Sequence, residues 1–143
     1  NAGLGLSHGM AHALGGRFHI PHGRANAILL PYVMSFNAGL DGQITPTSER
    51  YGQIADLLGL ETVNVRQGAV SLIHATRRCA EKLGIPATLR GAGVDEQKFG
   101  LALPELAAAA VADRGTTTNP RPCSEQEAVQ LFRRAYSGPL SFT

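Results

Sequence analysis

Helical spacing of the apolar residues dominates this chain, and no run alternates in the way that a half-buried strand does. A first helix is expected over residues 2–14, ended by the pair Gly15–Gly16 as C-cap residues. A connection over 17–21 leads into a second helix over 22–36, and Pro31 inside it is expected to kink it. Because its run around Pro31 is apolar on every side, this helix is predicted to lie in the middle of the core.

Turn residues and capping patterns divide the middle of the chain. A loop over 37–46 precedes a third helix that ends at about Leu58, with Thr45 as N-cap and Pro46 in the first turn. Asn64–Gln67 resembles a capping box and opens a fourth helix, which Gly84 ends. The apolar stripe of this helix is predicted to consist mostly of Val65, Ala69, Leu72, Ile73, Ala80 and Leu83.

The last third of the chain follows the same pattern. After a loop over 83–94, Asp95 caps a short helix to about residue 102, and an alanine-rich helix follows over 104–112. A turn region over 113–122 precedes a last helix, which the capping box at Ser124–Glu127 opens and which runs to about Tyr136. The pattern predicts one domain over residues 1–143, an all-α bundle of six or seven helices.

Composition narrows the class of protein. With 43% hydrophobic and 17% charged residues, the chain is typical of a globular domain, and its net charge of +2 predicts no nucleic-acid or membrane partner. The longest apolar run, residues 27–34, is too short to span a membrane, and no signal peptide is visible. Two cysteines, Cys79 and Cys123, are expected to be reduced thiols in the cytoplasm. Since the chain begins without Met and in helical sequence, we expect a piece of a longer protein.

Candidate chemistry is concentrated in residues 7–23, which hold four of the five histidines. His8 and His12 are one helical turn apart and therefore point the same way, which is a spacing used by paired metal ligands. A reversal of the chain after the glycine pair would bring His22 back beside His8. Three neutral imidazoles suit Zn, Fe, Ni or Cu better than Mg or Ca. A histidine pair on a helix is also commonly incidental, and His19 and His74 are expected at the surface.

Other features of the sequence near the histidines say less about function. No acidic residue lies near them in the sequence, the nearest downstream being Asp41 and Glu49. A metal with three histidine ligands needs at least one more position filled, and a catalytic site leaves that position to water or substrate. The glycine-rich start is not a phosphate loop because no strand precedes it, so Gly5 and Gly9 are interpreted as close-packing positions on a helix.

The segment GLGLSHGMAHALGGRFHIPHGRANAILLPYVMSFN, residues 3–37, closely resembles the signature of the iron-containing (group III) alcohol dehydrogenases. The matching elements are H-G-M-A-H, P-H-G and N-A-x-L-L-P-x-V-M-x-x-N, and YGQIADLLG, LGIP and NPRP extend the similarity towards the end of the chain. The resemblance implies the all-helical C-terminal domain of these enzymes, a dehydroquinate synthase-like α domain. It also implies an upstream Rossmann-like domain that binds NAD or NADP.

Site residues are assigned by this resemblance and not by spacing. It implies that His8 and His22 are two ligands of a divalent metal, Fe(II) or alternatively Zn, and that an Asp and a His upstream of this chain are the other two. His12, which spacing alone makes a third ligand, instead matches a residue beside the nicotinamide and the reacting alcohol that helps to relay protons. Phe18 and His19 either shape the substrate pocket or pack, and Asn26 either holds the His22 segment or caps a turn.

The function expected from the resemblance is metal-assisted hydride transfer between NAD(P) and primary alcohols, aldehydes or ketones. The parent enzyme is expected to be a homo-oligomer that takes a small alcohol or aldehyde. The chain alone is expected to be inactive and to bind metal weakly, because two ligands cannot close a site. The alternative is a stand-alone, non-catalytic helical domain that binds a metal or a partner protein. A third hypothesis is a related sugar-ring-forming or glycerol-oxidising enzyme, but the long signature over residues 3–37 argues against it.

Overall fold

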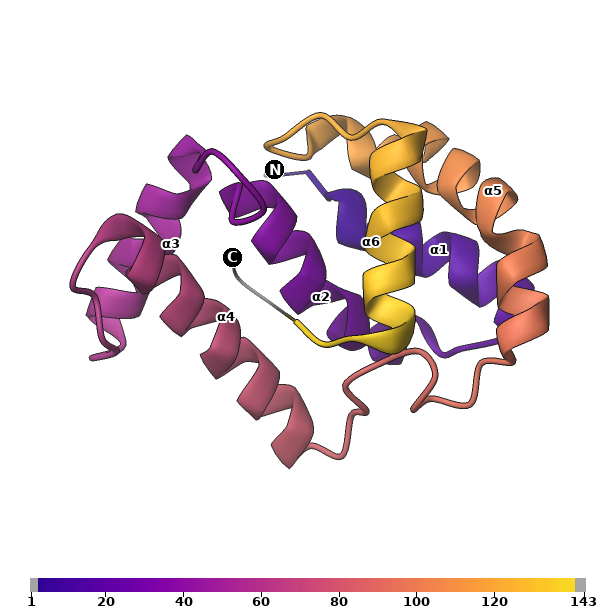
Figure 1. Cartoon of the computed structure of the whole chain (residues 1–143), viewed down its shortest axis with the longest axis horizontal. Coiled ribbons are helices and arrows are strands. Elements are labelled where there is room, and N and C mark those ends of the chain that lie inside the picture. Colours follow the sequence, from indigo (N-terminus) through magenta and orange to yellow (C-terminus); the bar gives the residue numbers. More distant parts are fainter. Residues whose placement is uncertain (1–2, 141–143) are drawn as a thin grey trace.

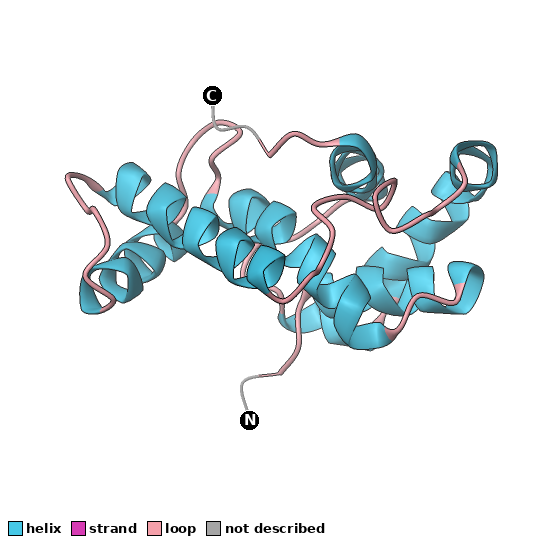
Figure 2. Ribbon diagram, turned by 90° about the horizontal axis from the view of Figure 1, so that it is seen from below, coloured by secondary structure: helices cyan, strands magenta, loops and turns pink. Residues whose placement is uncertain are grey.

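The computed structural model describes residues 3–140, which fold as helices joined by loops and contain no strand (Figure 2). Six α-helices and one 3-10 helix lie in this part of the chain, which confirms the predicted all-α bundle. They are α1 (Leu6–Phe18), α2 (His22–Ala38), α3 (Pro46–Leu57), α4 (Val65–Lys82), α5 (Glu96–Ala112), η1 (Arg114–Thr118) and α6 (Glu125–Ser137). Within residues 3–140, none of these helices has both the length and the apolar character needed to cross a bilayer.

Helix α2 is the centre of the fold, as its sequence predicts. Figure 1 shows it between the pair α3 and α4 on one side and the helices α1, α5 and α6 on the other. Every residue from 31 to 40 is buried. The larger hydrophobic cluster joins α2 to α1, α5 and α6, and the smaller cluster joins Met34 and Ala38 at the end of α2 to α3 and α4. One helix therefore supplies apolar side chains to both clusters.

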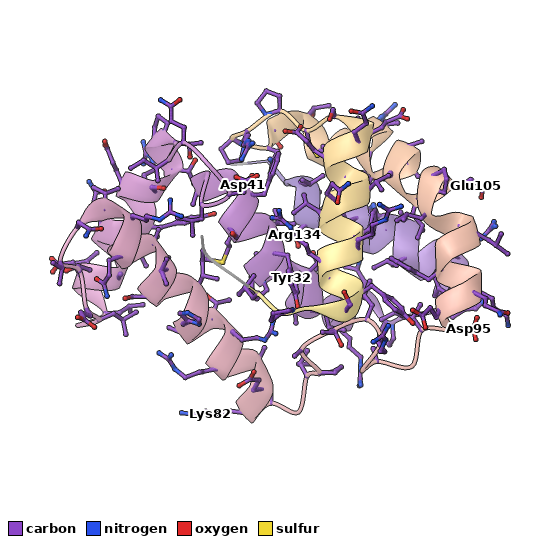
Figure 3. The ribbon with its side chains drawn as sticks, in the orientation of Figure 1. Tyr32, Asp41, Lys82, Asp95, Glu105 and Arg134 are labelled. Atoms are coloured by element: carbon purple, nitrogen blue, oxygen red, sulfur yellow. The ribbon has the colours of Figure 1, made fainter. Side chains whose placement is uncertain are left out.

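Tyr32 shows how this central helix is connected to its surroundings. Its side chain lies inside the fold, whereas Lys82 and Glu105 lie at the periphery (Figure 3). The Tyr32 hydroxyl donates a hydrogen bond to the Ala87 carbonyl at 2.9 Å, and the Arg77 guanidinium lies over its ring. Burial raises the pKa of Tyr32, so the hydroxyl stays protonated and remains a donor. Pro31 lies inside α2 and does not interrupt it.

The predicted end of the first helix is wrong. Its predicted start at residue 2 lies outside the described residues, but the prediction of helix over residues 3–5 is also wrong, because the helix begins at Leu6 and continues through both Gly15 and Gly16. It ends at Phe18, and the C-cap residue His19 adopts the left-handed conformation (φ 56°) and donates its backbone N–H to the Gly15 carbonyl. Phe18 and Ile20 pack against the larger cluster on either side of this turn, and their burial outweighs the weak helix propensity of glycine.

Other boundaries differ in smaller ways. Helix α2 extends beyond residue 36 to Ala38. Residues 96–112 form one helix with Pro104 inside it, whereas the sequence predicted two, because Leu103 and Leu106 are both buried against the larger cluster and continue the same face. On α4 the middle of the predicted stripe is buried, but Val65 and Leu83 at its ends are exposed.

The predicted caps are confirmed where the chain signals them locally. The side chains of Asn64 and Asp95 each accept a backbone N–H at the start of α4 and α5, and Ser124 with Glu127 forms the predicted capping box of α6. The capping box predicted for Asn64–Gln67 is only half formed, because the Gln67 side chain accepts from the Val63 N–H instead of the Asn64 N–H. Thr45 is the N-cap residue of α3, but its hydroxyl donates to the Asn37 carbonyl instead of capping the helix.

Helix α1 is capped from a distance. Its N-cap residue Gly5 has no side chain, and Asn119 supplies the acceptor, because its Oδ1 accepts from the Leu6 backbone N–H at 3.1 Å. The amide of Asn119 donates to Asn37 Oδ1 at 2.8 Å and to the Arg121 carbonyl at 2.7 Å. The NPRP segment therefore connects the start of α1 to the end of α2.

We predict that Asn119→Ala lowers the free energy of unfolding by about 2–3 kcal/mol, because it leaves several half-buried polar groups without partners. The matched control is Asn64→Ala, which removes one exposed helix cap and is expected to cost about 1 kcal/mol. Urea unfolding followed by circular dichroism measures both. Equal costs for the two variants would contradict the role given to Asn119.

Candidate metal centre

Three histidine side chains converge at the junction of α1 and α2. His8 and His12 lie one turn apart on the same face of α1, and His22 is the first residue of α2. The ring centroids are 4.1 Å apart for His8 and His12, 4.6 Å for His8 and His22, and 5.0 Å for His12 and His22. Each ring offers a nitrogen that lies within 4.8 Å of the other two. The expected return of the chain beside His8 is therefore confirmed.

The three imidazoles differ in exposure. His8 is partly buried, whereas His12 and His22 are exposed. Burial lowers the pKa of His8, the neighbouring His12 and His22 lower it further, and the carboxylate of Asp113 acts in the opposite direction. The innermost imidazole is therefore held in the neutral form, which is the form that binds a metal.

An acidic residue faces the cluster, although the sequence predicted none near it. Asp113 Oδ2 lies 2.9 Å from His12 Nδ1, across a separation of 101 residues in the chain. The other carboxylate oxygen accepts the Gly115 backbone N–H at 2.7 Å and thereby caps η1. The hydrogen bond with His12 lowers the pKa of Asp113, and the bond from Gly115 also lowers it while burial opposes the shift. No local sequence signal connects Asp113 to the histidines, since the contact exists only in the tertiary structure.

Gly9, between the two histidines of α1, allows this contact. A Cβ atom at residue 9 would lie 2.8 Å from the Ala110 carbonyl oxygen and would overlap the Thr116 hydroxyl. A side chain at this position would therefore separate α1 from the end of α5 and from η1. The interpretation of Gly9 as a close-packing position is confirmed, while Gly5 lies just before the helix with Asn119 near the place of a Cβ.

Asn26 contacts His22, which decides between its two predicted roles. Its amide nitrogen lies 3.1 Å from His22 Nε2 and donates to the His22 carbonyl at 3.2 Å. Its Oδ1 accepts a hydrogen bond from the Ser7 hydroxyl at 3.1 Å. Ser7 and Asn26 therefore hold the start of α2 against α1, beside the histidines.

The remaining candidates lie outside the cluster. Phe18 packs with its ring centroid 6.4 Å from that of Phe99, which favours the packing role over a pocket role. His19 is exposed at the C-cap of α1, and His74 is exposed on α4, as expected for surface histidines.

A groove of about 820 Å³ leads to the cluster from the side of α3. Apolar residues such as Leu30, Met34 and Ile54 line most of it, and it reaches the cluster at His8. Burial raises the pKa of Tyr51 in its wall, and a hydrogen bond with Asn37 opposes this shift. The groove gives the innermost histidine access from outside the fold.

The donor set fits a transition metal. Imidazole nitrogens bind Zn(II), Fe(II), Ni(II) and Cu(II), whereas Mg(II) and Ca(II) require oxygen ligands. Metal-ligating histidines usually donate their second ring nitrogen to a carboxylate or carbonyl, and Asp113 stands in that position behind His12. The cluster can therefore offer two or three nitrogens to one ion and leave the outward side open.

The comparisons with known proteins agree with this architecture. The family model described as Fe-containing alcohol dehydrogenase family, C-terminal, matches residues 1–136. Lactaldehyde reductase from Escherichia coli (strain K12) is 40% identical over 141 residues, which cover 95% of this chain and 34% of that enzyme. 1,3-Propanediol dehydrogenase from Citrobacter freundii is 38% identical over 138 residues, which cover 95% of this chain and 33% of that enzyme.

Solved structures show the same likeness. A crystal structure of a 1,3-propanediol oxidoreductase superimposes with a TM-score of 0.79 at 37% identity, over 93% of this chain and 33% of that one. The iron-containing alcohol dehydrogenase from Thermococcus thioreducens also gives 0.79, at 36% identity, over 95% and 32% of the two chains. The chain belongs to the Fe-containing alcohol dehydrogenase family and corresponds to its C-terminal portion. It spans about a third of the length of the curated relatives it matches.

We predict an acid-dependent effect of Asp113→Asn. The pKa of Asp113 in the folded chain lies below its ordinary value of 3.8, so the carboxylate contributes stability that is present above that pH and is lost as the pH falls through the lowered pKa. The free energy of unfolding should therefore differ between wild type and Asp113→Asn at about pH 5, and this difference should shrink on acidification towards about pH 3.

Urea unfolding over this pH range measures the difference. Asp113→Ala is the companion variant, since it also removes the cap at Gly115 and should cost about 1 kcal/mol more at every pH. A difference between wild type and Asp113→Asn that does not change on acidification would show that the charge of Asp113 has no stabilising partner in the fold.

Proposed function

We propose that this chain is the C-terminal, metal-binding domain of an NAD(P)-dependent, iron-containing alcohol dehydrogenase that interconverts primary alcohols and aldehydes or ketones. The observation that carries the proposal is the convergence of His8, His12 and His22 within the segment that bears the family signature. Relatives named 1,3-propanediol dehydrogenase, lactaldehyde reductase and NADPH-dependent butanol dehydrogenase support a small alcohol or aldehyde as substrate and a nicotinamide cofactor. An upstream domain of the same parent chain would bind that cofactor.

In this proposal His8 and His22 are the metal ligands that this chain contributes, and the other ligands come from upstream. Fe(II) is the expected ion and Zn(II) the alternative, since imidazole suits both. When bound, the metal supplies Lewis-acid polarisation of the alcohol or carbonyl oxygen, and the nicotinamide carries the hydride. Asn26 and Ser7 hold the His22 segment against α1, and so help to keep the ligands together.

His12 is the proposed proton-relay residue. The His12 side chain is 52% accessible to solvent, whereas the side chain of Asp113, which it contacts, is 20% accessible. With the carboxylate accepting from Nδ1–H, the Nε2 atom is left to take up or release a proton between the substrate side and solvent. Asp113 is in this respect a positioning residue, because it orients the ring and does not itself reach the substrate.

Two further parts of the proposal concern the parent protein. We assign it to the cytoplasm because thiols stay reduced there and because Cys79 and Cys123 are both free. Burial raises the pKa of Cys123 to about 11, which keeps that thiol protonated. Its assembly as a homo-oligomer is proposed from the family resemblance.

A stand-alone, non-catalytic metal-binding domain is the second candidate, because the three histidines come together within this chain alone. The coding sequence upstream of residue 1 separates the two candidates. An open frame that encodes a glycine-rich nucleotide loop and an Asp and His ligand pair favours the enzyme. A start codon directly before residue 1 favours the stand-alone domain.

The catalytic test is a chimera in which this chain replaces the C-terminal third of Escherichia coli lactaldehyde reductase. We predict NAD(P)-dependent oxidation of short alcohols with bound iron or zinc, and loss of both metal and activity in His8→Ala and His22→Ala. His12→Asn should retain the metal while kcat falls by about 10²–10⁴-fold, because only the proton relay is removed. His74→Ala is the control and should match the parent chimera.

Metal analysis and the absorbance of the reduced nicotinamide measure these outcomes. A chimera that folds, binds metal and turns over no alcohol or aldehyde would contradict the proposed function. Turnover by the 143-residue chain alone would also contradict it, since the proposal assigns the cofactor site to the upstream domain.

A further inference from the structure

We propose that the side chains of Thr118 and Asn119 form a clamp on the start of α1 that positions His8, and that both are positioning residues for the reaction of the parent enzyme. The inference rests on the proposed function in taking His8 as a group that this reaction needs in place. The clamp itself belongs to the fold of this chain. It joins the turn region at the end of η1 to the segment that precedes the histidines.

The first turn of α1 has little local support. His8 is only the third residue of the helix, after Leu6 and Ser7. Gly5 at the N-cap position has no side chain to accept from the free N–H groups, and the first turn contains no acidic residue to interact with them. Gly9 directly after His8 lowers the helix propensity further. This turn is therefore expected to unwind readily unless tertiary contacts hold it.

Two adjacent side chains of the turn region supply such contacts. Thr118 Oγ1 donates a hydrogen bond to the Leu4 carbonyl at 2.7 Å. Asn119 Oδ1 accepts the Leu6 N–H at 3.1 Å. The start of the chain lies beside the segment between α5 and α6, as η1 packs against α1 (Figure 1). The two bonds therefore hold the backbone on both sides of Gly5.

Gly3 shows how closely the clamp fits the chain. Its φ of 75° lies in the left-handed region, and a Cβ there would lie 2.5 Å from Thr118 Oγ1. A side chain at residue 3 would therefore push the Leu4 carbonyl away from the hydroxyl. Asn119 is oriented as well, because its amide donates to Asn37 Oδ1 at 2.8 Å and so turns its own oxygen towards α1.

The position of His8 depends on this turn. The rings of His8 and His22 have their centroids 4.6 Å apart, and unwinding of the first turn would separate them. His12 lies one turn further along and would remain in the helix. A ligand binds a site less tightly in proportion to the fraction of molecules in which the site is assembled. The clamp raises that fraction without touching the substrate or the cofactor.

The first test needs neither metal nor substrate. In the 143-residue chain, nuclear Overhauser contacts between the rings of His8 and His22 report their separation. Thr118→Val and Asn119→Ala should each weaken this contact at least twofold, because the first turn then opens. Thr117→Val is the matched control, since the Thr117 hydroxyl donates at the same 2.7 Å to a carbonyl within η1. It should leave the ring contact unchanged.

Asn119→Asp separates the clamp from general support of the fold. Aspartate keeps an acceptor for the Leu6 N–H but loses the hydrogen bonds donated to Asn37 and to the Arg121 carbonyl. It should therefore lower the free energy of unfolding and still keep the ring contact of the two histidines. A ring contact that is unchanged in Thr118→Val and Asn119→Ala would overturn the inference. Equal loss of the contact in Asn119→Ala and Asn119→Asp would also overturn it.

The chimera with lactaldehyde reductase tests the effect on the reaction. Thr118→Val and Asn119→Ala should each lower its affinity for Zn(II) by about 3–10-fold, as expected when one hydrogen bond that keeps a site assembled is lost. Excess metal should restore kcat, since binding favours the assembled state, and a residue that only stabilises the fold elsewhere would not respond in this way. Thr117→Val should match the parent chimera.

The two tests distinguish failure of this inference from failure of the proposed function. A chimera that turns over no alcohol or aldehyde would remove the proposed function, while the ring contact in the chain would still decide whether the clamp positions His8. An active chimera whose affinity for Zn(II) is unchanged in Thr118→Val and Asn119→Ala would instead overturn this inference and leave the proposed function standing.

Discussion

The close approach of α1 to the corner between α5 and η1 is the contact on which the rest of the site depends. It is possible because residue 9 is glycine, and any side chain there would meet the Ala110 carbonyl. Through this approach Asp113 reaches His12 and Asn119 reaches the first N–H of α1. The close approach therefore has two effects. It allows Asn119 to cap α1, the helix that carries His8 and His12, and it places a carboxylate beside His12.

The three histidines share a segment of sequence but not an environment. His8 is partly buried and held neutral, His12 is exposed against a carboxylate, and His22 begins a helix beside an asparagine. Such differences are what allow identical side chains to take different chemical roles within one cluster, because the partner of each ring sets its tautomer and its orientation.

Features with a local physical cause could be predicted from the sequence. The caps at Asn64, Asp95 and Ser124 need only residues three positions away, and the central position of α2 follows from the apolar run over residues 27–34. The convergence of His22 with His8 also followed, from a short connection between two helices. The histidine pattern restricted the candidate site to a few residues, and its chemistry was consistent with a transition metal.

Features that depend on tertiary contacts could not be predicted from the sequence. The contact of Asp113 with His12 joins residues 101 positions apart, and nothing in the turn region around Asp113 indicates it. The end of α1 was misplaced because the burial of Phe18 and Ile20 outweighs the local preference of two glycines, and α5 is continuous because packing tolerates Pro104. In each case a favourable long-range interaction overrides a local signal of moderate strength.

The division of the fold into two hydrophobic clusters has a consequence for its motions. The smaller cluster joins α3 and α4 to Met34 and Ala38 in the last turns of α2, whereas His22 lies at the start of that helix. Because regions with fewer buried contacts open at lower free energy, α3 and α4 form a unit that can exchange its amide hydrogens by local opening while the histidine cluster stays assembled. Residues of α3 form one wall of the groove beside His8, so local opening of α3 and α4 is expected to change the width of the groove.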